Sequence, residues 1–159
     1  MSTFVSGIFC LNKNDLITQE KFTFRVQKIA SDFEIGCKFG GNISEAAFKN
    51  YSAEHVSLNT AFELMDTPID NSSEELFGPE IYEEENEGNL EKRMLRIENF
   101  FHSILESSEV DRIILDICYT EGFKEQTLEL QCFEFTKRIT TLYAENIGYA
   151  PIIRLVIKK

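Results

Sequence analysis

The stretch that decides the fold is residues 90–118, LEKRMLRIENFFHSILESSEVDRIILDIC. In its first part apolar residues recur every three or four positions, as on one face of an amphipathic helix; they are Leu90, Met94, Ile97, Phe101, Ile104 and Leu105. Asn89 is the expected N-cap of this helix. The run Ile113–Cys118 is rich in β-branched residues and has few polar ones, which predicts a central strand of a sheet.

Further strands are predicted on both sides of this unit. Phe4–Leu11 is a mostly apolar run, and a turn is expected at Asn12–Asp15. In Phe22–Val26 and Phe33–Phe39 apolar and polar residues alternate as in a half-buried strand, and the short connection between them predicts an antiparallel hairpin. Ile152–Ile157 is expected to form the last strand.

Two more helices are predicted from apolar residues at helical spacing. The first ends at Pro68, and its apolar face consists of Leu58, Ala61, Phe62 and Met65. The second lies within Thr127–Asn146, where a strand-like alternation at the start competes with a longer helical stripe. The longer stripe favours a helix that ends near Gly148. Between the first of these helices and residue 90, the stretch 68–89 has several Gly, Pro, Asn and Ser residues and is predicted to be a surface loop.

These elements predict one globular domain, residues 1–159, of the α+β or α/β class. We expect a mixed β-sheet of about five strands packed with amphipathic helices. The length of 159 residues and the 43% of hydrophobic residues are ordinary for a single domain. The sequence has no internal repeat and no Pro-rich or Gly/Ser-rich linker. A chain of this length is expected to fold without a metal or a disulfide.

The N-terminus and the cysteines predict a cytoplasmic protein. The first ten residues, MSTFVSGIFC, have neither a basic region nor a long apolar region, so no signal peptide is expected. The apolar runs of the chain are too short to predict a membrane span. Cys10, Cys37, Cys118 and Cys132 are scattered without a C-x-x-C motif, so we expect buried thiols in a reducing compartment rather than two disulfides.

Charge is distributed very unevenly along the chain. The net charge is −11, with 27 acidic residues against 16 Lys and Arg, which excludes a nucleic-acid binder that relies on its own basic surface. Residues 50–91 hold twelve of the acidic residues and no Lys or Arg. The remaining 15 acidic residues are balanced by the 16 basic ones, so the rest of the chain is nearly neutral. Clustering like charges increases self-repulsion, whereas solubility requires only mixed charges.

Two interpretations of the acidic surface loop at about 68–89 are open. The loop is either solvated without a partner, or it is a surface for a basic protein, whose encounter rate carboxylates raise at low salt. Apolar residues within it either dock on that partner or hold the loop on the protein's own core; they are Leu76, Phe77, Ile81 and Tyr82. The predicted partner-binding residues are Asp70, Glu74, Glu75, Phe77, Glu80, Tyr82, Glu83, Glu84, Glu85 and Glu87.

The sequence contains no recognisable catalytic, metal-binding or cofactor-binding motif. His55 and His102 have no second His or Cys at metal-ligand spacing, and the acidic residues do not follow the EF-hand pattern. There is no Gly-rich phosphate-binding motif and no G-x-S-x-G. Asp116 lies within an apolar strand, where pairing with an Arg or with a helix terminus is more common than an acid–base role. We therefore predict no enzyme activity, no metal and no cofactor.

The chain resembles the immunity proteins of bacterial toxin–immunity pairs, in particular those that accompany contact-dependent growth-inhibition toxins. The resemblance lies in the size, the single α/β-type domain, the acidity, and the run from Glu74-Glu75-Leu76-Phe77 to Tyr82-Glu83-Glu84-Glu85. It implies a basic cognate toxin, often a nuclease, that is bound tightly and blocked at its active site or at an exosite. It also implies neutralisation by occlusion and charge complementarity, without direct binding to nucleic acid or membrane.

Two alternatives remain open at this stage. One is a small enzyme of unrecognised type that uses Asp116, or a Cys together with a His. The other is a general acidic protein-interaction module. Steep weakening of partner binding by salt favours the inhibitor, whereas loss of an activity on Cys→Ala or His→Ala substitution favours the enzyme.

Overall fold

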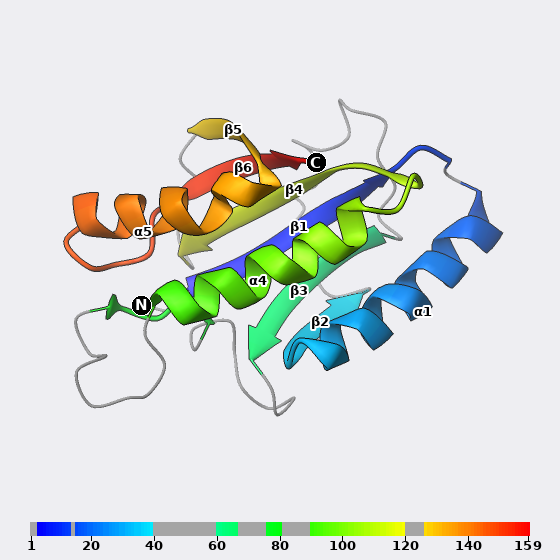
Figure 1. Ribbon diagram of the computed structural model, residues 1–159, viewed down its shortest axis with the longest axis horizontal. Coiled ribbons are helices and arrows are strands. Elements are labelled where there is room, and N and C mark those ends of the chain that lie inside the picture. Colours follow the sequence, from blue (N-terminus) through cyan, green and yellow to red (C-terminus); the bar gives the residue numbers. More distant parts are fainter. Residues whose placement is uncertain (1–2, 14, 40–59, 67–75, 81–89, 120–125) are drawn as a thin grey trace.

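The computed structural model describes residues 3–13, 15–39, 60–66, 76–80, 90–119 and 126–159 (Figure 1). A 3₁₀ turn, Cys132–Glu134, leads directly into the last helix. The described helices and strands are, in chain order, β1 (Thr3–Leu11), α1 (Leu16–Asp32), β2 (Ile35–Phe39), β3 (Ala61–Asp66), α4 (Leu90–Leu105), β4 (Val110–Tyr119), β5 (Thr127–Gln131), α5 (Phe135–Glu145) and β6 (Ile153–Lys158).

The six described strands form one mixed sheet in the order β2-β3-β1-β4-β6-β5. Neighbouring strands are antiparallel except β5 and β6, which are parallel. The expected α+β class with a mixed sheet of about five strands and amphipathic helices is therefore confirmed, with one strand more. β4 is an interior strand between β1 and β6, as its scarcity of polar residues predicted.

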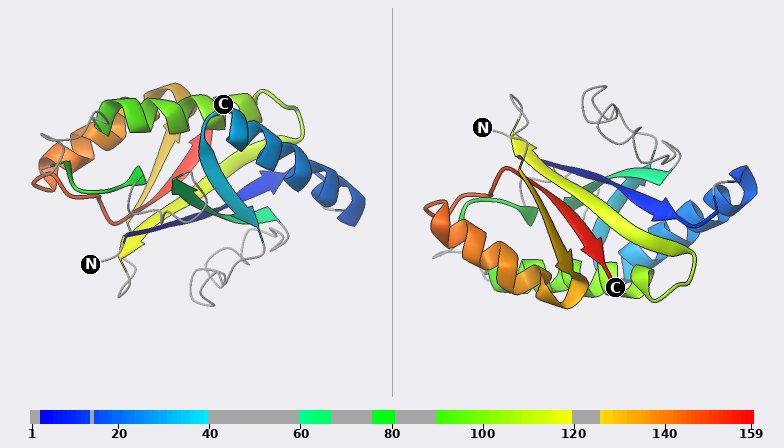
Figure 2. Two further views of the ribbon diagram at one scale, coloured as in Figure 1. Left: turned by 90° about the horizontal axis from the view of Figure 1, so that it is seen from below. Right: turned by 90° about the horizontal axis from the view of Figure 1, so that it is seen from above.

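The helices α1, α4 and α5 all lie on the same face of the sheet (Figures 1 and 2). The predicted helix over residues 90–105 is confirmed as α4, which runs along the middle of this face. Its buried residues are Leu90, Met94, Ile97, Phe100, Phe101, Ile104 and Leu105. Together with inward-facing residues of the strands, such as Ile113 and Leu115 of β4, they form the main core. The Asn89 cap lies outside the described residues.

The predicted strand at Phe22–Val26 is wrong, because these residues belong to helix α1. Asp15 caps this helix: its side chain accepts hydrogen bonds from the Thr18 N–H at 2.9 Å and the Thr18 hydroxyl at 2.7 Å. These bonds lower the pKa of the Asp15 carboxyl. The buried positions recur every three or four residues and are Gln19, Phe22, Val26 and Ala30. Phe24, which the strand pattern placed with Phe22, is 71% exposed.

The predicted helix on residues 58–65 is also wrong over the residues that the structure describes. Ala61–Asp66 form strand β3, which lies between β1 and β2. Phe62 and Leu64 belong to the main core. Ala61 is buried together with Ile8 in a second, smaller cluster of apolar residues. The strand predicted at Phe33–Phe39 is confirmed only from Ile35, as β2, since Phe33 is the C-cap of α1. Its antiparallel partner is β3 rather than Phe22–Val26.

The stretch 127–146 is strand first and helix second. Thr127–Gln131 form β5, because they pair with β6 from Arg154 to Lys158 at the edge of the sheet. The helix begins only at Phe135, so the prediction of one helix is wrong for its first part and confirmed for the rest. The pairing of β5 with β6, which comes later in the chain, is a tertiary interaction. It outweighs the helical spacing of the apolar residues in this stretch.

The end of α5 contains a residue in an unfavourable backbone conformation. The Gly148 N–H donates to the Tyr143 carbonyl at 2.8 Å and the Ile147 N–H to the Ala144 carbonyl at 3.4 Å, which is the Schellman pattern. Gly148 closes the helix as predicted, with φ of 81°. However, the left-handed position next to the C-cap is occupied by Ile147, with φ of 58°, where a β-branched side chain is strained.

Candidate functional site

The structure describes two of the ten predicted partner-binding residues. Phe77 is fully buried in the main core together with Leu76, so these two apolar residues hold their segment on the protein's own body. Glu80 is exposed. The other eight lie outside the described residues; they are Asp70, Glu74, Glu75, Tyr82, Glu83, Glu84, Glu85 and Glu87.

Residues 76–80 belong to the acidic stretch, by which we mean residues 50–91. Hydrogen bonds hold them against the rest of the domain. The Arg93 side chain on α4 donates from Nε to the Leu76 carbonyl at 3.1 Å and from Nη2 to the Gly78 carbonyl at 3.5 Å. The Glu80 N–H donates to the Gly148 carbonyl at 2.7 Å, which joins the segment to the end of α5. With Leu76 and Phe77 buried, the position of Glu80 relative to α4 and α5 is therefore set by packing and by hydrogen bonds.

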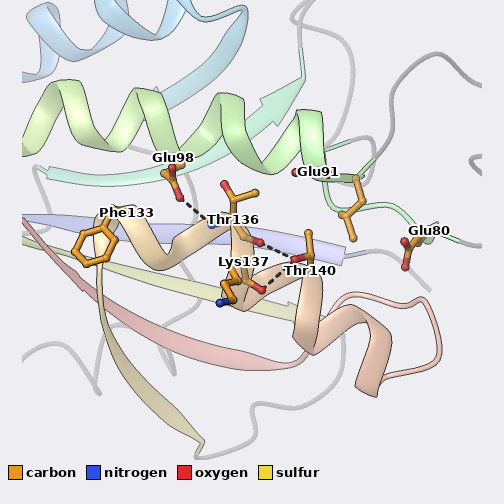
Figure 3. A pocket seen from close by; sticks show the side chains of 8 residues that line it. Glu80, Glu91, Glu98, Phe133, Thr136, Lys137 and Thr140 are labelled. Atoms are coloured by element: carbon orange, nitrogen blue, oxygen red, sulfur yellow. Dashed lines mark hydrogen bonds between the residues drawn. The ribbon is translucent and has the colours of Figure 1, made fainter.

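Glu80 borders a groove of about 630 Å³ between α4 and α5 (Figure 3). Glu91 and Glu98, seven residues apart on α4, contribute to it from one side. Phe133 and Glu80 lie at opposite ends of the groove (Figure 3). The described residues that line it are Glu80, Leu90, Glu91, Glu98, Phe133, Thr136, Lys137 and Thr140.

The charge of this groove is negative. Among the described residues that line it, there are three carboxylates, from Glu80, Glu91 and Glu98, and one ammonium, from Lys137. Among the residues that the structure describes, no basic side chain forms an ion pair with any of the three. We call this surface, with its eight lining residues, the acidic groove. The excess of negative charge in the acidic groove favours the binding of a cationic group.

Glu98 also positions α5 relative to α4. Its Oε1 accepts a hydrogen bond from the Thr136 N–H at 3.0 Å, within the first turn of α5 (Figure 3). A carboxylate at this place satisfies a backbone donor that the helix itself leaves unpaired and interacts favourably with the helix dipole. The Thr136 hydroxyl oxygen is buried and makes no hydrogen bond.

The cysteines, one of the alternative sources of catalysis, are in unfavourable surroundings for a nucleophile. All four are free. Burial raises the pKa of the Cys132 thiol to about 12, with a further contribution from the nearby charge of Glu98. Burial also raises the pKa of Cys37 and, together with the charge of Asp116, that of Cys118. Because the thiolate is the reactive form, these environments disfavour nucleophilic chemistry at neutral pH.

Asp116, the other alternative, is paired with an arginine, as its sequence context suggested. Arg154 on β6 donates to both carboxylate oxygens of Asp116, from Nε and from Nη2, each at 2.8 Å. The bidentate pair joins opposite residues of β4 and β6, and Asp116 is 1% exposed. His102 pairs with Glu106 at 3.1 Å along α4. Within the described ranges, no three His, Cys, Asp or Glu side chains are grouped so as to hold a metal ion.

Sequence analysis missed most of the acidic groove. Glu91 was counted among the acidic residues of the central stretch, but Glu98, Phe133, Thr136 and Lys137 were not singled out. The spacing of Glu91 and Glu98 placed them on one face of a helix that was correctly predicted, and this was the available signal. The lining residues on the α5 side were not predicted, because the sequence pattern did not show where α5 begins.

No family model matches the chain, and no curated protein or solved structure is significantly similar to it. Over the described residues, no helix combines the length and the apolar character that crossing a membrane requires.

Proposed function

We propose that this protein binds and neutralises a basic protein, in the manner of a cytoplasmic immunity protein, and does not itself catalyse a reaction. The observation that carries the proposal is the segregation of charge: residues 50–91 contain twelve acidic residues and no basic one, while the rest of the chain is nearly neutral. A basic nuclease is a partner of matching charge, because a nuclease carries positive charge where it binds phosphate. Carboxylates at that site compete with phosphate and speed association.

The structure supports this proposal at the part of the acidic stretch that it describes. Residues 76–80 are held on the body by buried apolar side chains and by Arg93, and Glu80 lines the same groove as Glu91 and Glu98 of α4. A surface that is already ordered loses less conformational entropy on binding than a free acidic tail does. A positioned acidic surface therefore fits an inhibitor better than a merely solvated loop.

The proposal predicts that a neighbouring reading frame encodes a protein with a basic domain, and that domain is the first partner to test. Producing that domain in cells should stop growth, and co-producing this protein should restore it. Binding of the two purified proteins should weaken steeply as the salt concentration rises, because exposed charges are screened. Failure to bind this domain, together with failure to capture any basic protein at low salt, contradicts the proposal.

A charge-reversal variant tests whether the acidic stretch is responsible. Replacing Glu83, Glu84 and Glu85 together by Lys should slow association roughly tenfold or more, which is the scale of electrostatic steering. The matched control, with the same change in net charge, replaces the exposed residues Glu20, Asp32 and Glu145 by Lys. Stopped-flow association rates of the two variants should differ strongly, and circular dichroism checks that both are folded. Equal rates contradict a role for the acidic stretch.

A further inference from the structure

We propose that the turn 146–149, at the end of α5, is an apolar contact site for the basic partner. This inference rests on the proposed function and deepens it, because it names the residues that slow dissociation of the complex. The turn exposes the side chains of Ile147 and Tyr149. It lies at one end of the molecule, next to residues 76–80 of the acidic stretch (Figures 1 and 2).

The backbone conformation of Ile147 is costly, and the fold gains little from it. Its φ of 58° lies in the left-handed region, where Gly or Asn is usual and a β-branched side chain is strained. Its side chain is 81% exposed, so burial does not offset the strain. Among the described residues the other non-Gly residue at positive φ is Glu34, which has no branch at Cβ. Residues in such conformations gather at binding sites, so we infer that Ile147 serves a contact with another molecule.

The exposed side chains of the turn have the composition of an interface centre. Tyr149 is 41% exposed and lies two residues after Ile147, so the turn offers an aromatic ring and an aliphatic side chain together. The residues that dominate protein–protein affinity are enriched in Tyr and are surrounded by polar groups. Glu145 and Asn146, which precede Ile147, are exposed and polar. The turn therefore has an apolar centre with polar residues beside it.

The charges around the turn match a basic partner. Residues 139–153 contain no Lys or Arg, and they include the exposed carboxylate of Glu145. The Glu80 N–H donates to the Gly148 carbonyl at 2.7 Å, which places a second exposed acidic residue beside the turn. The guanidinium of Arg93 donates to two backbone carbonyls of residues 76–80. A partner drawn to the acidic stretch by its positive charge therefore meets the apolar side chains of the turn at the same edge.

Hydrogen bonds fix the shape of the turn before a partner arrives. The side-chain amide of Asn146 donates to the carbonyls of Tyr149 at 3.2 Å and Ala150 at 2.9 Å. The Tyr149 N–H in turn donates to the Asn146 carbonyl at 3.2 Å. With Gly148 bonded to residues 76–80, the turn is held from both sides. An ordered contact surface loses less conformational entropy on binding, which favours affinity.

The experiment measures the association and dissociation rates of the full-length protein with the purified basic domain from the neighbouring reading frame. Ile147→Gly should speed dissociation roughly tenfold or more and leave the association rate nearly unchanged, because loss of an apolar contact acts mainly on dissociation. The same variant should unfold at a higher temperature than the wild type, since the strain is removed. Because stability and affinity then change in opposite directions, partial unfolding cannot explain the weaker binding.

Further variants identify the apolar side chain as the contact. Ile147→Asn tolerates the left-handed conformation but is polar, and should bind as weakly as Ile147→Gly. Ile147→Leu keeps an apolar side chain, and its affinity should stay within about twofold of the wild type. Tyr149→Ala should speed dissociation roughly tenfold. The matched control is Phe24→Ala, which removes a 71% exposed ring from α1 at the other end of the molecule and should change neither rate (Figures 1 and 2).

The outcomes separate failure of this inference from failure of the proposed function. If the wild type binds and neutralises the basic domain, but Ile147→Gly or Tyr149→Ala dissociates at the wild-type rate, the turn is not the contact and the proposed function stands. The inference is also overturned if Ile147→Leu or Phe24→Ala weakens binding as much as Ile147→Gly. If the wild type binds neither this domain nor any basic protein at low salt, the proposed function fails and the inference fails with it.

Discussion

Helix α4 has a groove on each side, and the two grooves differ in charge. The acidic groove lies between α4 and α5. The other, of about 380 Å³, lies between α4 and the end of α1, and its described lining residues are Asp32, Phe33, Glu34, Lys92, Leu95, Arg96 and Asn99. Here two acidic side chains are balanced by two basic ones. We call this second surface the balanced groove.

The two grooves rest on similar packing. Beneath the balanced groove, Phe100 of α4 packs against Phe33 with ring centroids 6.3 Å apart. Beneath the acidic groove, Phe101 of α4 packs against Phe135 of α5 with centroids 5.7 Å apart. A helix whose charges served solubility alone would show mixed charges on both sides. Among the described residues, the excess of negative charge beside α4 therefore lies on the α5 side only, although an aromatic pair supports the helix on both sides.

The prediction with the largest effect concerns Phe100 and Phe101, the two rings of α4 that pack beneath the two grooves. Phe100→Ala and Phe101→Ala should each lower the free energy of unfolding by about 3–5 kcal/mol, because both rings are fully buried and their removal leaves a cavity. Urea denaturation measures both losses. Phe101→Leu should lose less, since it keeps most of the volume. A loss below about 1 kcal/mol for Phe101→Ala alone would mean that α5 is loosely packed and that the acidic groove is not preformed.

The prediction with an intermediate effect concerns how residues 76–80 are held next to the acidic groove. Arg93→Ala removes two donors to the carbonyls of Leu76 and Gly78, and should lower the free energy of unfolding by about 1–3 kcal/mol. Hydrogen exchange at the Glu80 amide, which is bonded to Gly148, should become faster. Arg93→Lys should show a smaller change, since it keeps one donor group. An unchanged Glu80 exchange rate would show that the buried side chains alone hold the segment.

The prediction with the smallest effect concerns Ile147. This residue precedes Gly148, whose carbonyl accepts the hydrogen bond from the Glu80 N–H. Ile147→Gly should raise the free energy of unfolding by up to about 1 kcal/mol, because Ile147 is strained at a positive φ and is 81% exposed, so little packing is lost. Thermal unfolding measures the shift. Ala144→Gly, at an exposed position within α5, is the matched control and should instead destabilise by about 1 kcal/mol. Destabilisation by Ile147→Gly would indicate that the side chain makes stabilising contacts.

Elements whose local pattern agrees with their tertiary packing were predictable from sequence, and the others were not. The apolar stripe of α4 extends over four turns, so local spacing and tertiary packing agree. In α1 the alternation of Phe22, Phe24 and Val26 suits a strand, but the Asp15 cap and the buried positions from Gln19 to Ala30 favour a helix. For β3 and β5 the deciding interactions are pairings with β1, β2 and β6, which no local pattern contains.

The candidate site shows the same division. The concentration of negative charge in residues 50–91 was evident from the sequence, because charge is a property of the chain itself. The burial of Phe77, and the gathering of Glu80, Phe133 and Thr136 around one groove, depend on the tertiary packing. These residues are far apart in sequence, and packing against the sheet brings them together.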